Sequence, residues 1–467
     1  MVNFFRHHVP AATLLQLLIE AGLFFLAVLI AVKLHRHAAT LSEPAVFAPA
    51  FLFACLMVCV NGAFGLYRRD QRLDFVSFVA RAIVALFVGF VVAYVTFGML
   101  PYGGIFQDAL WFTVVYALAG LVIAHQVLLL PLSRAVFPHR ILVLGTGPEA
   151  RAVEQCLAEA NQPNLKLMGF YPLAQGVTLA PGTKPAVPAH RIISPAWAID
   201  EAAWKLGVNE IVVAVREQRG GVLPLEQLLT CRVSGVRVSD FAGFIERTRG
   251  EVPVTTLKAS WLIYSDGFRQ NWSRSAVKRL FDLFVSLMLL TLAAPIMVVA
   301  ALAIALESGF PIIYRQERVG ARGQKFWLLK FRSMVRDAEP NGEAKWASVN
   351  DARVTRVGKF LRRTRFDELP QLINVLKGEM SFVGPRPERP CFVAELSHKV
   401  PFYAVRHSVK PGITGWAQVR APYGASVEDA VRKLQFDLYY VKNHTFFLDL
   451  LILLETVRVV LFAEGAR

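Results

Sequence analysis

The sequence predicts an α/β membrane protein with three parts: a four-helix transmembrane unit, a small doubly wound parallel α/β domain, and a mainly helical α+β domain with a re-entrant membrane hairpin. Apolar residues make up 55% of the chain and the mean hydropathy is +0.43, which is too apolar for an ordinary soluble domain. Four long apolar segments occupy the first 135 residues, and strand-like runs alternate with helix-like runs after them. These two patterns predict the membrane unit and the α/β domain respectively.

The predicted domain boundaries follow these changes in composition. A length of 467 residues is enough for two or three domains. We expect the transmembrane unit in 1–135, the α/β domain in 136–250, a linker in 251–275 and the third domain in 276–467.

The charge of the chain indicates anionic partners. The formal net charge is +16, from 51 basic and 35 acidic residues, and such an excess suits phosphates and lipid headgroups. No zinc-finger, RNA-binding-sheet or basic-zipper pattern occurs, so nucleic acid is not an expected partner. The five cysteines are scattered without a Cys-x-x-Cys spacing, as expected for reduced thiols in a cytosolic or membrane setting.

Each of the four apolar segments, 11–32, 45–66, 79–99 and 109–131, is close to the ~20 residues that cross a hydrocarbon core. The positive-inside bias sets their orientation. Basic residues follow the second and fourth segments, and the loop 101–108 after the third has none, whereas Lys33 and Arg36 oppose the trend. The pattern favours a cytoplasmic location for both ends of the unit. The basic residues that set it are Arg68, Arg69, Arg72, Arg134 and Arg140.

The α/β domain contains a glycine-rich turn after its first predicted strand, Ile141–Leu144. Gly145-Thr-Gly147 precedes a helix-like run, and such a turn can present backbone amides to a phosphate. The acidic residue that would bind a ribose is missing, because the second strand runs into Phe170-Tyr171-Pro172. The turn therefore fits either weak dinucleotide binding through Gly145 and Gly147 or a structural or regulatory Rossmann-like domain. Further strands are expected at 165–169, 210–215 and 236–238.

A fifth apolar segment, Phe281–Leu306, is long enough to span a membrane. Asp282 lies near its start and Pro295 near its middle, where proline removes a helical hydrogen bond and kinks the chain. Basic sequence flanks both ends. The residues alone leave a span and a re-entrant hairpin at about 279–306 equally open, and the expectation that the following domain is cytosolic favours the hairpin.

Residues 310–445 combine arginines with paired acids. Pro370 is tolerated only in the first turn of a helix, so Asp367 and Glu368 are predicted at or just before a helix start. The helix dipole and three upstream arginines should keep Asp367 ionised. A carboxylate beside guanidinium groups suits phosphoryl transfer. The alternative is that Asp367 only caps a helix while the arginines face lipid headgroups. The arginines are Arg362, Arg363 and Arg365.

Several ordered motifs in this region resemble the bacterial sugar transferase family, the monotopic phosphoglycosyl transferases. They are Lys330-Phe-Arg-Ser-Met334, Asp367-Glu-Leu-Pro-Gln371, Gly384-Pro-Arg-Pro387, Lys410-Pro-Gly-Ile-Thr-Gly-Trp-Ala-Gln418 and Asp437-Leu-Tyr-Tyr440. The likeness covers roughly 275–465, and the preceding parts are similar to those of the larger members. The segment Ser260–Phe268 further resembles members found with exosortase-linked exopolysaccharide clusters.

The resemblance implies transfer of a sugar-1-phosphate from a UDP-sugar to a polyprenyl phosphate, expected to be undecaprenyl phosphate, as the first step of exopolysaccharide or capsule assembly. Asp367 would be the nucleophile, with release of UMP. Asp367 and Glu368 would hold Mg²⁺, or Glu368 would help to place the incoming lipid phosphate. Pro295 matches the helix-breaking proline of a re-entrant hairpin. The resemblance also implies a lipid bilayer as partner, a homodimer, and an inner-membrane location with the catalytic domain facing the cytoplasm. The expected phosphate-binding residues are Lys330, Arg332, Arg362, Arg386 and Arg420.

Arg420 departs from the common family pattern. Many members read Trp-Ala-Gln-Val-Asn-Gly-Arg, whereas this chain reads Trp416-Ala-Gln-Val-Arg420 and then Ala-Pro. Arg420 would stand in for the later arginine of the family.

Two other functions were weighed. A membrane nucleotide-sugar dehydratase or epimerase needs a Tyr-xxx-Lys pair, and no tyrosine in the chain is followed by lysine four residues later. A non-enzymatic scaffold that senses nucleotides would not depend on Asp367, and the intact Asp-Glu pair among arginines speaks against it.

Overall fold

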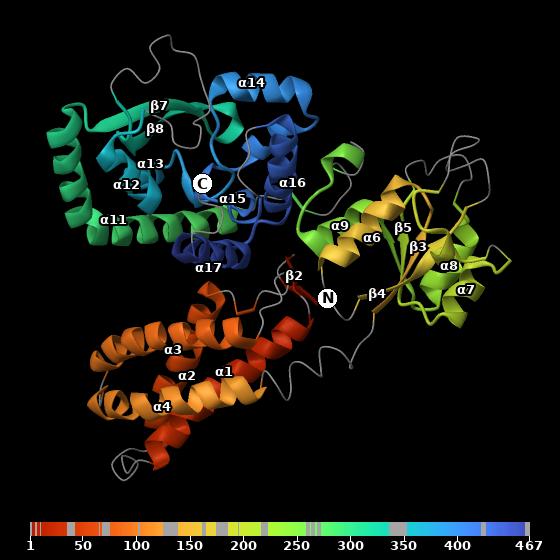
Figure 1. Cartoon of the computed structure of the whole chain (residues 1–467), viewed down its shortest axis with the longest axis horizontal. Coiled ribbons are helices and arrows are strands. Elements are labelled where there is room, and N and C mark those ends of the chain that lie inside the picture. Colours follow the sequence, from red (N-terminus) through yellow and green to blue (C-terminus); the bar gives the residue numbers. More distant parts are fainter. Residues whose placement is uncertain are drawn as a thin grey trace. The chain divides into compact units, whose positions relative to one another are not determined.

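The computed structural model of the chain forms two compact units, one ending at Gly250 and the other beginning at Glu251 (Figure 1). Each is described by itself. At the N-terminus lie two short strands, β1 (Val2–Phe4) and β2 (His7–Val9). The structure describes residues 2–4, 7–9, 11–34, 43–64, 66–67, 75–100, 103–124, 139–160, 165–173, 185–194, 196–215, 223–257, 262, 267–268, 272–335, 353–421 and 426–462.

Four apolar helices pack together in the first unit. Their shared core is built from aromatic and small residues, including Phe24, Phe53 and Phe97. Glu20 is buried among them and accepts hydrogen bonds from Gln16 Nε2 (2.8 Å) and from Asn61 Nδ2 of the next helix (3.2 Å). The helices are α1 (Ala11–Leu34), α2 (Glu43–Ala63), α3 (Phe75–Gly98) and α4 (Gly103–Ile123).

Their outer faces expose large apolar side chains such as Phe51, Phe87 and Trp111. Among the described residues, five helices are long and apolar enough to cross a membrane: these four and α11 (Trp272–Ser308). The predicted apolar segments therefore form helices close to the expected bounds, although the fourth begins and ends earlier than predicted. The arginines used for the orientation, apart from Arg140, lie outside the described residues.

The α/β part is a four-stranded parallel sheet of order β4-β3-β5-β6, which confirms the predicted doubly wound parallel domain. Helices α6 and α9 cover one face and α7 and α8 the other (Figure 1). The strands are β3 (His139–Leu144), β4 (Leu165–Tyr171), β5 (Glu210–Val213) and β6 (Arg237–Asp240). The helices are α6 (Pro148–Ala160), η3 (Ala189–Arg191), α7 (Ile199–Lys205), α8 (Leu225–Val233) and α9 (Phe241–Arg249).

The second unit is mainly helical, as predicted, and contains an antiparallel hairpin and one short parallel strand pair. Its elements after α11 are β7 (Ile313–Val319), η5 (Ala321–Gly323), β8 (Lys325–Phe331), α12 (Arg356–Thr364), η6 (Phe366–Glu368), α13 (Gln371–Lys377), β9 (Ser381–Val383), α14 (Pro390–Lys399), η7 (Tyr403–Ser408), β10 (Gly412–Thr414), α15 (Trp416–Arg420), α16 (Val427–Asn443) and α17 (Phe446–Phe462).

The start of the predicted linker 251–275 belongs to this second unit. Val252 and Val254, the latter in η4 (Val254–Thr256), are buried in the core formed by α16 and α17. The backbone N–H of Val252 donates to the carbonyl of Gln435 (3.0 Å). These valines are part of an apolar cluster, so residues 251–257 are packed chain rather than a free connection.

Helix α11 is attached to the second unit at both of its ends. Near its start, Arg279 donates to the carbonyls of Val375 (2.6 Å) and Leu376 (2.8 Å) in the last turn of α13. Near its end, Ile304 packs against Phe331 and Leu361. Figure 1 shows the helix changing direction between these two attachments. Pro295 lies inside it and provides the physical cause of a kink.

The α/β domain has a buried ion-pair cluster at the start of β5. Glu210 accepts from His139 Nε2 (2.9 Å) and Ser239 Oγ (2.5 Å), and it pairs with Arg247. Burial alone would raise the pKa of Glu210, but these partners outweigh it and lower the pKa to about 2. Because the folded-state pKa lies below the ordinary value, the pairing stabilises the domain above pH ~4.5 and the stabilisation is lost as the pH falls towards 2.

We therefore expect Glu210→Gln to destabilise the α/β domain by about 2–3 kcal/mol at pH 7. Amide hydrogen exchange of β5 in the full-length protein measures the change. The gap between wild type and variant should shrink as the pH falls from 4.5 towards 2. The exposed Glu201→Gln is the control and should leave β5 protection unchanged. An equal effect of both substitutions would contradict the assigned role of Glu210.

Candidate active site

Asp367 and Glu368 lie on a single 3₁₀ turn between two helices. Arg365 ends α12 in the left-handed conformation (φ 62°), and the turn η6 follows it at once. Pro370 then directly precedes α13, where its fixed φ and missing N–H suit a helix start. The two acids thus lie just before a helix start, as the sequence predicts.

Glu368 lies among cations. Its Oε1 is 2.9 Å from Lys330 Nζ on β8, 3.5 Å from Arg386 Nη2 and 4.0 Å from Arg365 Nη1. Burial by itself would raise the pKa of Glu368, but Lys330 and Arg386 outweigh it and hold the pKa well below its usual range. The carboxylate of Glu368 is therefore ionised at neutral pH and fixed in position by its cations.

Asp367 has a different environment although it is the next residue. It is 8% exposed, and its Oδ1 has no hydrogen-bond partner among the described residues. Burial raises its pKa, the charge of Lys330 opposes this, and the charge of Glu368 raises the pKa further. That neighbouring arginines keep Asp367 ionised stays a prediction, although burial moves its pKa upwards. Arg365 and Arg362 do lower the pKa, but desolvation is the larger effect.

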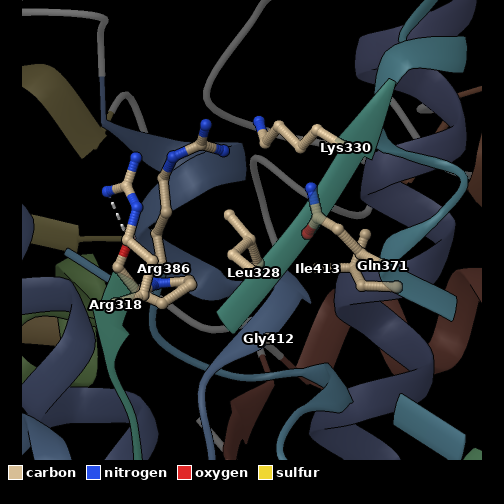
Figure 2. Close-up of a pocket in the computed structure, with 8 residues that line it drawn as sticks. Arg318, Leu328, Lys330, Gln371, Arg386, Gly412 and Ile413 are labelled. Atoms are coloured by element: carbon tan, nitrogen blue, oxygen red, sulfur yellow. Dashed lines mark hydrogen bonds between the residues drawn. The ribbon is translucent and has the colours of Figure 1, made fainter. Parts of the chain in front are cut away.

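Figure 2 shows the pocket that contains Lys330 and Arg386, the two cations that contact Glu368. Lys330 and Arg386 extend toward the same side of a pocket that Arg318 and Gln371 also line. The pocket floor comes from Leu328, Gly412 and Ile413. Two of the predicted phosphate-binding residues are thus brought together with the acidic pair.

The other predicted phosphate-binding residues differ in their distance from the acidic pair and in their partners. Arg362 is near enough to Asp367 to lower its pKa. Arg332 is 7% exposed, and its Nη2 donates to the carbonyls of Ser308 (2.7 Å) and Gly309 and to Ser308 Oγ at the end of α11. Nη2 therefore binds the end of α11, whereas Nε and Nη1 have no partner among the described residues. The phosphate-binding role of Arg332 stays a prediction.

Arg420 also has other partners. Its Nη2 is 2.6 Å from Glu455 Oε1 on α17, and its guanidinium lies over the Trp416 ring at 4.5 Å. The described contacts of Arg420 tie α15 to α17.

The backbone around Arg386 is fixed by residues that the sequence analysis missed. Arg406 donates to the Arg386 carbonyl (3.0 Å) and pairs with Asp437 (2.7 Å), while Arg318 donates to the Pro387 carbonyl (3.0 Å). Arg406 and Asp437 lie far from the acidic pair in the sequence and reach this loop only through the fold. Only the motif containing Asp437 gave a sequence signal, and it carried no assignment.

Asn374 is a second missed residue. It is fully buried on α13, its Oδ1 accepts from the Leu329 N–H (3.0 Å), and its Nδ2 donates to the Trp327 carbonyl (2.8 Å) and Glu379 Oε2 (2.6 Å). The amide thereby fixes α13 against β8, and this sets Lys330 opposite Glu368. The apolar spacing around Asn374 gave no sign of this role.

The glycine turn of the α/β domain has a structural explanation at its first glycine. Gly145 has a φ of +118°, and a Cβ there would lie 2.6 Å from the Ala214 carbonyl oxygen. The close passage of the chain after β5 therefore requires glycine whether or not a ligand binds. A Cβ on Gly147 would make only an ordinary van der Waals contact, with Glu149 Oε2 at 3.5 Å. The second strand ends at Tyr171, whose hydroxyl donates to the Trp197 carbonyl (2.7 Å), so an acid is missing there as predicted.

The acidic pair fits Mg²⁺. Carboxylate oxygens suit this ion, which is usually held by one or two carboxylates together with substrate phosphates. Asp367 Oδ1 is a buried acceptor without a donor among the described residues, and a cation would satisfy it. No group of three or more metal-ligating side chains occurs in the described part of the chain, so substrate oxygens would have to complete the coordination.

Comparison with known proteins places this site in context. The family model described as "Bacterial sugar transferase" matches residues 273–463. The UDP-N-acetylgalactosamine-undecaprenyl-phosphate N-acetylgalactosaminephosphotransferase of Aeromonas hydrophila is 46% identical over 191 residues, 41% of this chain and 45% of that protein. The UDP-glucose:undecaprenyl-phosphate glucose-1-phosphate transferase of Caulobacter vibrioides is 42% identical over 191 residues, 40% of this chain and 71% of that protein.

A shorter relative is matched over most of its length. The uncharacterized sugar transferase EpsL of Bacillus subtilis is 42% identical over 191 residues, 41% of this chain and 90% of that protein. The chain spans less than half of the Aeromonas relative, so the likeness concerns the second unit, with α11 and the acidic pair inside it.

Removal of the Asn374 amide should weaken the attachment of α13 to β8 and destabilise the protein. We expect Asn374→Ala to lower the free energy of unfolding by about 1–3 kcal/mol, because two backbone groups of β8 lose their hydrogen-bond partners. Denaturant unfolding of the purified protein measures this, and Lys377→Ala on the exposed face of α13 is the control. A change below about 0.5 kcal/mol would mean that Asn374 does not secure α13 to β8.

Proposed function

The chain belongs to the bacterial sugar transferase family, and from this premise we propose that it transfers a sugar-1-phosphate from a UDP-sugar to undecaprenyl phosphate as the first step of exopolysaccharide or capsule assembly. The observation that carries the proposal is the Asp367–Glu368 turn facing Lys330 and Arg386. Relatives whose names state this type of reaction support it.

In the proposed first step, an Asp367 carboxylate oxygen attacks the β-phosphorus of the UDP-sugar. A bond forms between that oxygen and phosphorus, and the bond from this phosphorus to the bridging oxygen breaks, so UMP leaves. A phospho-sugar remains esterified to Asp367. The buried carboxylate suits this role because it has shed most of its water and has no competing hydrogen-bond donor on Oδ1 among the described residues.

In the second step, an oxygen of the lipid phosphate attacks the same phosphorus and the Asp367 carboxylate leaves. The product is a polyprenyl diphosphate sugar. Lys330 and Arg386 are placed to stabilise the negative charge on the phosphoryl oxygens in both steps. Asp367 and Glu368 would hold Mg²⁺, which when bound neutralises charge on the phosphates.

The membrane arrangement is part of the proposal. Helix α11 has 37 residues and would be about 55 Å long if straight, well above the ~30 Å of a hydrocarbon core. Both of its ends are bonded to one globular unit, through Arg279 at the start and Arg332 at the end. A single folded unit cannot lie on both sides of a bilayer, so we propose that α11 enters the membrane, turns at Pro295 and returns on the same face.

The remaining parts of the proposal follow from this topology. The helices α1 to α4 would span the inner membrane, and the second unit would face the cytoplasm, where nucleotide sugars are made. The relatives act on different sugars by their names, so the proposed donor class is UDP-hexoses and UDP-N-acetylhexosamines. The homodimer that the resemblance implies stays a prediction.

The test of the activity uses the purified full-length protein with UDP-glucose, UDP-galactose or UDP-N-acetylgalactosamine, Mg²⁺ and undecaprenyl phosphate. We expect UMP release with at least one donor, and a loss on the order of a thousandfold or more in Asp367→Asn, because the amide cannot attack phosphorus. Glu428→Gln makes the same kind of change at an exposed position of α16 and should keep wild-type rates. UMP release that is equal in Asp367→Asn and wild type would sink the mechanism.

The hairpin predicts that both ends of α11 lie on one side of the membrane. In a cysteine-free background, Trp272→Cys and Leu306→Cys place single thiols at exposed positions near the two ends. A membrane-impermeant maleimide added to sealed, oriented vesicles should label both from the cytoplasmic side and neither from the other side. Labelling from opposite sides would show that α11 spans the bilayer.

A further inference from the structure

We propose that a groove between the second half of α11 and α12 binds the isoprenoid chain of the acceptor lipid next to its phosphate. This inference rests on the proposed function and names the binding site of one of its substrates. The groove is lined by Ile296, Val299 and Ala303 of α11, Phe360 and Leu361 of α12, and Phe366 of η6. We call it the α11–α12 groove.

The α11–α12 groove is apolar and large enough for part of a lipid chain. Its volume is about 370 Å³, within the range of roughly 300–1,000 Å³ that small-molecule sites occupy. Phe360 and Phe366 face each other edge to face with ring centroids 6.4 Å apart. Val299 is 66% exposed on a helix that is apolar enough for a membrane. The groove therefore opens on the surface that the hairpin presents to lipid.

One end of the groove reaches the acidic pair. Phe366 lines the groove and Asp367 is the next residue, so their Cα atoms are ~3.8 Å apart. Leu361 similarly precedes Arg362, whose charge acts on Asp367. A chain lying in the groove would bring a group at its end to the carboxylate that the mechanism uses.

The charges around the groove match an anionic head on an apolar tail. Arg356 is the one charged residue in its lining, counting the residues that the structure describes. Lys330 and Arg386 lie beyond Asp367, beside Glu368. A polyprenyl phosphate has this pairing of an isoprenoid chain with a terminal phosphate. A UDP-sugar has no apolar chain that could fill the groove.

The main experiment compares Val299→Trp with Val298→Trp in the full-length enzyme. The two valines are neighbours on α11 with similar exposure, 66% and 58%, but only Val299 lines the groove. We expect Val299→Trp to lower kcat/KM for undecaprenyl phosphate at least tenfold, because the indole fills the groove. The kcat/KM for the UDP-sugar should stay within twofold of wild type, and Val298→Trp should change neither value.

Two kinetic outcomes would overturn the inference. Equal losses in both variants would mean that the apolar surface of α11 matters in general and the groove does not. Wild-type kinetics in Val299→Trp would mean that the groove is not used. Ala303→Phe fills the groove from another position on α11 and gives the same comparison if Val299→Trp does not fold.

A binding measurement separates the groove from the proposed reaction. Single cysteines, Val299→Cys and Val298→Cys in a cysteine-free background, are labelled with a thiol reagent in vesicles of fixed phospholipid composition. Undecaprenyl phosphate should slow the labelling of Val299→Cys at least fivefold and leave Val298→Cys unchanged. If undecaprenyl phosphate protects Val299→Cys from labelling but the wild-type enzyme releases no UMP, the groove binds the lipid and the proposed activity is rejected. Equal labelling with and without undecaprenyl phosphate would assign the groove to bilayer acyl chains and overturn the inference.

Discussion

The ion pair between Lys330 and Glu368 joins two parts of the chain that are 38 residues apart. Lys330 is on β8 of an antiparallel hairpin, and Glu368 is on a one-turn 3₁₀ helix. Asn374 fixes α13 to β8 and so supports their 2.9 Å contact. The pair leaves a cation beside a partly buried carboxylate, and this electrostatic arrangement sets the state of the neighbouring Asp367.

In the proposed topology, the attachment of α11 at both ends places that arrangement at the edge of a membrane. Arg279 bonds the carbonyl end of α13, and Arg332 bonds the end of α11 itself close to β8. The helix that would enter the bilayer is therefore held by the elements that carry the acidic pair. The polar pocket and the apolar groove lie on the two sides of η6, because Phe366 lines the groove and Glu368 meets the cations of the pocket.

The sequence predicted the architecture well because the elements are long or strongly periodic. Apolar runs of membrane length and the alternation after Arg140 predicted the helices and the parallel sheet to within a few residues, except for α4, which begins six and ends eight residues before its predicted bounds 109–131. The position of the acidic pair followed from Pro370, whose backbone restricts where a helix can begin. These are local constraints, and local constraints can be read from one sequence.

The parts of the site that could not be predicted depend on contacts between distant residues. Arg332 and Arg420 are basic residues in or beside matched motifs, yet their described partners are helix carbonyls and Glu455. Arg406 and Asn374 gave no local signal because their partners include backbone groups of other elements. The upward direction of the Asp367 pKa could not be predicted for the same reason, because upstream arginines are visible in the sequence whereas burial is not.

The opposite pKa shifts of two adjacent acids suggest how the pair divides its work. Glu368 is held ionised by Lys330 and Arg386 and is committed to them, so it is poorly placed to attack phosphorus. Asp367 is desolvated and its Oδ1 has no donor among the described residues, which leaves it the more basic and less encumbered carboxylate. Environments that shift the pKa values of two neighbouring acids in opposite directions generally give the two acids different roles. The same burial that makes Asp367 costly to ionise thus supports it, rather than Glu368, as the residue that would carry the phospho-sugar between an aqueous donor and a lipid acceptor.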